Sequence, residues 1–107
     1  MAILNGGQLA ARQLQVAGVD TIFGVVAGPT VGIMSAAAEL GLTVVGCRHE
    51  ENAAFMASAW AFATRKPGVV VTGSGPGMTN TVTPMHVATE SAMPLVVLGG
   101  SGPRSRS

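Results

Sequence analysis

The chain has 107 residues, which is enough for one domain and too few for two. Hydrophobic residues make up 48% of the chain and charged residues only 10%, whereas a free-standing domain usually carries about a quarter charged residues. We therefore expect a large part of the surface to pack on another domain or subunit. The net charge of +1, with no basic cluster beyond Arg104 and Arg106, argues against a nucleic-acid-binding surface.

The single cysteine, Cys47, excludes an internal disulfide and a multi-cysteine metal site, and it fits a reducing, cytoplasmic location. The first residues lack the basic segment of a secretory signal. The longest apolar stretch, residues 53–63, is too short to span a bilayer and is interrupted by Ser58. A buried core thus explains the high hydrophobic content better than a membrane segment does.

Helix and strand patterns alternate along the chain. The predicted strands are short and apolar, at residues 21–26, 43–46, 69–72 and 95–98. The predicted helices lie between Asn5 and Gly18, from residue 29 or 30 to about 40, from 50 to about 64, and from about 78 to 91. Pro84 is expected to kink or break the last helix, and residues 101–105 are predicted to be a loop.

This alternation predicts an α/β fold, namely an open parallel sheet with helices on both faces in a flavodoxin- or Rossmann-like three-layer arrangement. The chain stops just after a strand, without a closing helix. We therefore expect residues 1–107 to be one domain that is truncated at its C-terminus.

Three predicted turns lie at the carboxyl ends of strands, where open α/β sheets bind their ligands. They are residues 26–29, 47–50 and 73–77, and they should converge on one edge of the sheet. The first turn contains Gly28, which lets a backbone approach a ligand closely, although an ordinary strand-to-helix turn is the simpler interpretation.

The third turn has glycine at positions 73, 75 and 77, and this spacing departs from the dinucleotide-binding pattern G-x-G-x-x-G. Its backbone N–H groups are able to bind an anion. Close packing of a helix on a strand, with a rigid Pro76, is the favoured interpretation.

The second turn leads into the alanine-rich helix through two acidic residues. The helix dipole, worth about 0.3–1 kcal/mol, is sufficient to explain Glu51. Glu50 instead shares one helix face with small residues by its spacing, namely Ala53, Ala54, Ala57 and Ala61. Such a face packs closely on a neighbour, so a carboxylate at its rim needs either a specific partner or a bound proton.

The order of these motifs resembles the N-terminal pyrimidine-binding domain of thiamine-diphosphate-dependent enzymes of the acetolactate synthase superfamily. The matching segments are Arg48-His49-Glu50, Asn52-Ala53-Ala54, Met56-Ala57, Lys66-Pro67-Gly68-Val69, Ser74-Gly75-Pro76-Gly77 and Asn80. Two further segments, residues 24–29 and 98–101, resemble the 2-hydroxyacyl-CoA lyase and oxalyl-CoA decarboxylase branch more than acetolactate synthase.

The resemblance implies a role for each matching residue. Glu50 would hydrogen-bond N1′ of the cofactor's aminopyrimidine and so promote loss of the proton from thiazolium C2. The remaining residues would line the ring or the nearby substrate carbonyl, and they are Val26, Ala27, Gly28, Gly73, Pro76 and Asn80. Gly73 replaces a hydroxyl residue that is common in acetolactate synthases, so only a backbone contact is expected there.

The resemblance also implies thiamine diphosphate as cofactor, with Mg²⁺ and the diphosphate held by a separate domain whose Gly-Asp-Gly motif this chain lacks. The active site would form against that domain of a partner subunit, in a homodimer or homotetramer, and this chain alone would be inactive. The expected substrate is a 2-hydroxyacyl-CoA or a 2-oxoacyl compound. Two alternatives stay open: a 2-oxoacid carboligase of the acetolactate synthase kind, with or without flavin, and a non-catalytic interaction or nucleotide-binding module.

Overall fold

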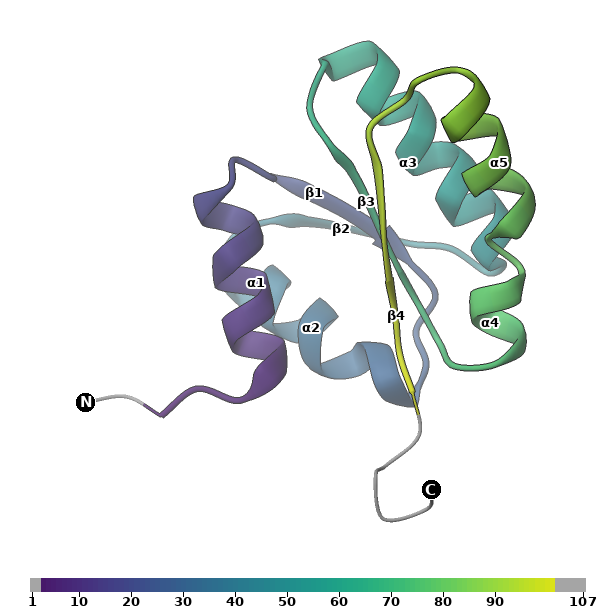
Figure 1. Cartoon of the computed structure of the whole chain (residues 1–107). Coiled ribbons are helices and arrows are strands. Elements are labelled where there is room, and N and C mark those ends of the chain that lie inside the picture. Colours follow the sequence, from purple (N-terminus) through teal and green to yellow (C-terminus); the bar gives the residue numbers. More distant parts are fainter. Residues whose placement is uncertain (1–2, 102–107) are drawn as a thin grey trace.

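The computed structural model describes residues 3–101 (Figure 1). Within them, helices and strands alternate in the order α1 (Gly6–Val16), β1 (Thr21–Gly24), α2 (Gly28–Glu39), β2 (Thr43–Gly46), α3 (Glu50–Thr64), β3 (Gly68–Thr72), α4 (Pro76–Thr79), α5 (Val82–Glu90) and β4 (Leu95–Gly99). The strands form one sheet in the order β2-β1-β3-β4, and every neighbouring pair is parallel. The predicted open parallel α/β sheet is therefore confirmed.

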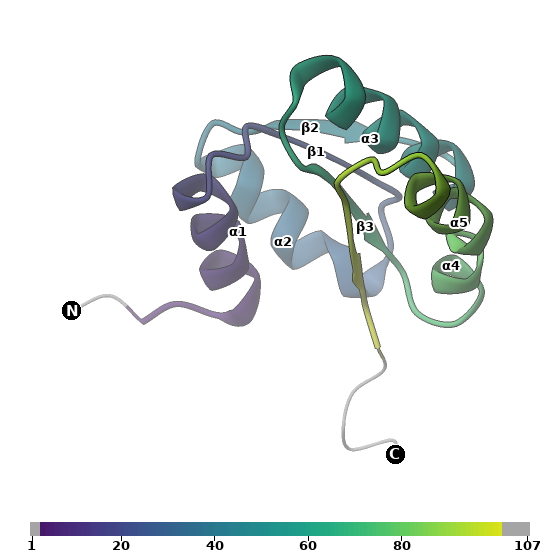
Figure 2. The same ribbon diagram turned by 45° about the horizontal axis from the view of Figure 1, so that its top comes forward.

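The helices cover both faces of this sheet. Figures 1 and 2 show α1 and α2 on one face and α3 and α5 on the other. Because successive side chains of a strand point to opposite faces, Ile22 packs in the cluster that includes residues of α1 and α2, whereas Phe23 packs against α3. The edge of the Trp60 ring meets the Phe23 ring, with the ring centroids 6.1 Å apart. The result is three layers with a separate core on each side of the sheet.

The predicted small-residue face of α3 is confirmed by its burial. Its members are at most 1% exposed, and they are Ala53, Ala54, Ala57 and Ala61. Gly68, at the start of β3, has no room for a side chain, because a Cβ atom there would overlap the Ala57 carbonyl oxygen and lie 3.3 Å from the Ala61 Cβ. The lack of bulk on both elements lets the backbone of α3 approach the sheet closely.

The predicted helix at residues 78–91 is wrong in one respect, since two helices occupy this range and the break precedes Pro84. The chain leaves the first helix at Asn80 and Thr81, where the Thr81 hydroxyl donates to the Met78 carbonyl oxygen at 2.6 Å. Pro84 lies in the first turn of α5, where backbone N–H groups have no intrahelical acceptor. Proline, which lacks an N–H, therefore loses no hydrogen bond at this position. Pro84 is thus accommodated in the first turn of the second helix and does not kink a longer one.

The first strand ends at Gly24, earlier than the predicted residue 26. Beyond Gly24 the side chain of Thr30 satisfies the backbone: its hydroxyl donates to the Val25 carbonyl at 2.8 Å and accepts from the Ala27 N–H at 2.9 Å. These bonds turn the chain away from the sheet ladder. Of the predicted loop at residues 101–105, all but Ser101 lies outside the described residues.

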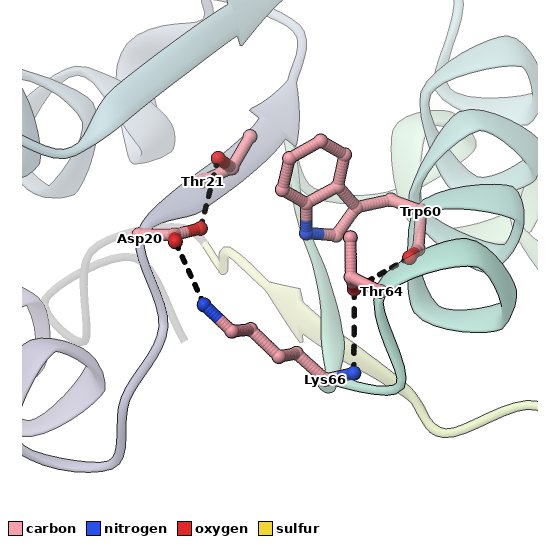
Figure 3. Close-up of polar contacts among 5 residues, drawn as sticks. All are labelled: Asp20, Thr21, Trp60, Thr64 and Lys66. Atoms are coloured by element: carbon pink, nitrogen blue, oxygen red, sulfur yellow. Dashed lines mark hydrogen bonds and ion pairs between the residues drawn. The ribbon is translucent and has the colours of Figure 1, made fainter.

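A polar tie links β1 and β3 at the amino edge of the sheet (Figure 3). Lys66 Nζ donates to Asp20 Oδ2 at 2.9 Å, and the Thr21 hydroxyl donates to Asp20 Oδ1 at 3.1 Å. These two hydrogen bonds hold the pKa of Asp20 below its ordinary value. Both charged side chains are about half exposed, so the ion pair contributes little to stability. It lies at the opposite edge from the three turns considered below.

Within residues 3–101, no helix combines the length and the hydrophobicity that are needed to cross a bilayer.

The close approach of α3 to β3 predicts that Gly68→Ala destabilises the protein. The added methyl collides with backbone, which cannot move aside, so we expect a loss of about 1–3 kcal/mol in the free energy of unfolding. Urea unfolding measures this loss. Gly46→Ala is the matched control, because it also lies at a strand end and a Cβ there meets nothing within 4 Å. Equal midpoints for the two variants would contradict the prediction.

Candidate functional site

The carboxyl edge of the sheet contains a topological switch point between β1 and β3. From β1 the chain crosses to β2 on one side, and from β3 it continues to β4 on the other. Ligands of open α/β sheets bind in the crevice at such a point. The two loops that leave β1 and β3 approach each other here, since a Cβ on Gly73 would lie 3.4 Å from the Ala27 Cβ. The two loops are therefore neighbours at this edge.

The turn after β1 is shaped by Thr30, which is 2% exposed. Besides its bonds to Val25 and Ala27, Thr30 reproduces one half of a capping box for α2, and Ala27 occupies the N-cap position. Gly28 and Pro29 begin the helix. The turn is therefore rigid, and it presents small residues at the edge of the sheet.

The turn after β2 places Glu50 at the first position of α3. The Cys47 N–H donates to the Gly24 carbonyl oxygen at 2.7 Å, which ties this turn to β1. His49 is the N-cap, and its Nδ1 accepts from the Glu51 N–H at 3.1 Å. This role of His49 was not anticipated, because histidine is not among the residues that favour N-caps. The cap determines where the helix begins and so where the Glu50 side chain emerges.

The Glu50 carboxylate is half-buried and bridges two segments that are distant in sequence. Asn80 Nδ2 donates to Glu50 Oε1 at 3.1 Å. The other oxygen, Oε2, lies over Gly77, where a Cβ would come within 2.9 Å of it. Asn80 thus provides the specific partner that a carboxylate in this position requires. The contact with Gly77 was missed in the sequence, where that glycine was interpreted only as part of a packing turn.

The structure brings some of the predicted site residues together and leaves others apart. Glu50 and Asn80 are bonded to each other, and Ala27 meets Gly73. The other three are largely open to solvent: Val26 is 68% exposed, and Gly28 and Pro76 are also exposed at the starts of α2 and α4. The expected convergence of three turns on one edge is therefore confirmed, whereas direct contact among all seven residues is not found within residues 3–101.

The glycine turn after β3 has the features of a packing turn. Gly75 has a φ of 60°, a conformation that favours glycine, and the Gly77 N–H is used in a bond to the Ser74 carbonyl oxygen at 3.3 Å. The helix that follows, α4, has only four residues, so its dipole is weak. These features do not favour a phosphate site in this turn.

A large hollow in the described surface lies away from these turns. It has a volume of about 520 Å³, is widely open, and is lined by residues at the amino end of β4 and the carboxyl end of α3, among them Arg65 and Pro94. A hollow of this size is a second candidate for a binding site. It contains no acidic side chain, however, and the carboxylate, its amide partner and the switch point all lie at the opposite edge. Chemistry therefore favours the carboxyl edge.

Comparison with known proteins identifies the family of the chain. Residues 4–107 match the family model described as "Thiamine pyrophosphate enzyme, N-terminal TPP binding domain". The chain is 41% identical over 103 residues to the acetolactate synthase large subunit of Mycobacterium tuberculosis, and the aligned residues make up 96% of this chain and 19% of that protein. It is 37% identical over 103 residues to 2-hydroxyacyl-CoA lyase 1 of Homo sapiens (96% and 18%) and 33% identical over 105 residues to oxalyl-CoA decarboxylase of Escherichia coli K12 (98% and 19%).

The chain thus spans about a fifth of the length of these relatives. The identity to the acetolactate synthase, 41%, is higher than the 37% and 33% to the two acyl-CoA enzymes, so these relatives do not support the expected closeness to the acyl-CoA branch, which stays a prediction. The family itself follows from a match that extends over nearly the whole chain. This chain belongs to the thiamine pyrophosphate enzymes, through their N-terminal TPP binding domain.

Proposed function

We propose that this chain supplies the aminopyrimidine-binding half of the active site in an enzyme that makes or breaks a carbon–carbon bond beside a carbonyl. Glu50 is the residue that activates the cofactor. The observation that carries this proposal is the half-buried carboxylate at the carboxyl edge, with one oxygen bonded to Asn80 and the other over Gly77.

The residues around this carboxylate fit a flat heterocycle. Ala27 and Gly73 present almost no side-chain bulk at the switch point, and Gly77 cannot carry a Cβ without displacing Glu50. Glu50 Oε2 accepts no hydrogen bond from the described residues, so it is available to a ring nitrogen. In this proposal Val26, Ala27 and Gly28 line the ring or the substrate carbonyl, and Gly73 and Pro76 contribute backbone surface.

Thiamine diphosphate, when bound, supplies an electron sink for chemistry beside a carbonyl. The task of Glu50 is to hold a proton between its Oε2 and N1′ of the pyrimidine. A carboxylate that is partly shielded from water makes a stronger hydrogen bond than one in bulk solvent. The half-buried position at the rim of the alanine face therefore suits Glu50 to this task.

The remainder of the active site is proposed to come from elsewhere. Residues 3–101 contain no group of three or more His, Cys, Asp or Glu side chains that could hold a metal ion. We assign Mg²⁺ and the cofactor's diphosphate to another domain, carried by a partner subunit of a homo-oligomer. Large apolar side chains exposed on α3 support a protein contact there, and they are Phe55, Met56 and Phe62.

The substrate class is proposed from the two segments that resemble the acyl-CoA branch. A 2-hydroxyacyl-CoA or oxalyl-CoA substrate is the first candidate. A 2-oxoacid such as pyruvate is the second, and the 41% identity to an acetolactate synthase supports it. A non-catalytic or nucleotide-binding module is the third and weakest candidate. The short α4, and the Gly77 N–H that already donates to the Ser74 carbonyl oxygen, do not favour a nucleotide phosphate there.

Replacement of Glu50 tests the assigned role. In the complete protein loaded with cofactor, Glu50→Gln should slow hydrogen–deuterium exchange at thiazolium C2 by about 100-fold or more, because the amide cannot share a proton with N1′ in the same way. Nuclear magnetic resonance of quenched samples measures the exchange. Glu51→Gln is the matched control, since Glu51 takes part in the cap only through its backbone N–H. An exchange rate in Glu50→Gln equal to that of the parent would remove Glu50 from the mechanism.

Product analysis separates the two substrate classes. We expect carbon–carbon bond formation from formyl-CoA and an aldehyde, or decarboxylation of oxalyl-CoA, and little acetolactate from pyruvate. Chromatography with mass detection identifies the products. Acetolactate as the dominant product would instead support the acetolactate synthase alternative, and it would leave the role of Glu50 untouched.

A further inference from the structure

We infer that Asn80 is a positioning residue, which holds the Glu50 carboxylate so that Oε2 is the oxygen presented to the ring. This inference rests on the proposed function of Glu50 and assigns Asn80 a different role from the one that the family resemblance implied. Asn80 does not line the cofactor but acts on it through the side chain of Glu50.

The first argument is that the bond joins two independent strand-to-helix units. Glu50 begins α3, which follows β2, and Asn80 ends α4, which follows β3. The Asn80 backbone is itself fixed, because its N–H donates to the Pro76 carbonyl oxygen at 3.0 Å. A glutamate has three rotatable side-chain bonds, and a half-buried one without a partner would lose its single orientation. The amide of Asn80 provides that partner from a rigid base.

The second argument concerns which oxygen is left free. Asn80 Nδ2 engages Oε1 at 3.1 Å, while Gly77 leaves the space that Oε2 occupies. Asn80 therefore holds the carboxylate through Oε1, and Gly77, which has no side chain, leaves space for Oε2. The residue type matters as well, since an aspartate at position 80 would offer no donor and would add a like charge about 3 Å from the carboxylate.

The test compares two ligands in the complete protein: thiamine diphosphate and its analogue in which C–H replaces N1′. In the parent we expect tighter binding of thiamine diphosphate, because only this ligand can share a hydrogen bond with Glu50. Asn80→Ala should weaken binding of thiamine diphosphate by about 10-fold, the cost of one hydrogen bond to a charged group, and leave the analogue unchanged. Asn80→Asp should weaken it further. Calorimetry measures both affinities, and Thr83→Ala, an exposed position on α5, is the control.

Two further comparisons strengthen the test. Asn80→Ala placed on Glu50→Gln should cause no additional loss, since a residue that acts only through Glu50 has nothing left to position. Asn80→Asp serves if Asn80→Ala fails to fold, because aspartate keeps the shape of the side chain but offers no donor to Glu50 Oε1. It should then reproduce the selective loss for thiamine diphosphate.

Each outcome decides the matter. Equal weakening of both ligands in Asn80→Ala would show that Asn80 contacts another part of the cofactor, and it would overturn the inference. Unchanged affinity for both ligands would overturn it too. If the parent binds the two ligands equally, then Glu50 does not engage N1′ at all, and the proposed function fails together with the inference. A preference in the parent that Asn80→Ala preserves refutes only the positioning role.

Discussion

The close approach of α3 to the sheet is the constraint on which the candidate site depends. The helix lies against β3 through side chains no larger than a methyl group, and Gly68 contributes no side chain at all. Interiors are packed too tightly to absorb an added methyl without movement. A bulkier residue on this face would lift α3 from the sheet and with it Glu50, which begins the same helix. Stability and the placement of the carboxylate therefore share one structural cause.

The parallel topology of the sheet brings the residues of the candidate site together at one edge. Because all strands are parallel, the turns that follow β1, β2 and β3 lie at one edge, and the loops that leave β1 and β3 approach each other at the switch point between these strands. Short backbone bonds then lock the turns together, such as the one from the Cys47 N–H to the Gly24 carbonyl oxygen. The amino edge holds the exposed Asp20–Lys66 pair and the hollow of about 520 Å³, whose lining contains no acidic group. The amino edge thus holds an ion pair that links two strands, and the carboxyl edge holds the candidate site.

Local features explain which predictions from the sequence succeeded. The bounds of α3 and β2 were predicted correctly, because turn residues delimit a strong pattern in each case. The end of β1 and the break before α5 were not, since each depends on a threonine hydroxyl that competes for backbone groups. Pro84 was recognised as disruptive but placed in the middle of a helix, although a first-turn position costs proline nothing.

The amino-acid sequence by itself determined the parallel α/β fold, the small-residue face of α3 and the edge of the sheet at which the three turns meet. These properties follow from periodicity and strand order, which are local. Only the tertiary structure decided that Asn80, thirty residues from Glu50, donates to its carboxylate, and that Gly77 lies beneath the second oxygen. Neither contact has a signature in spacing, because each joins separate strand-to-helix units whose relative position is set by how closely their helices pack on the shared sheet.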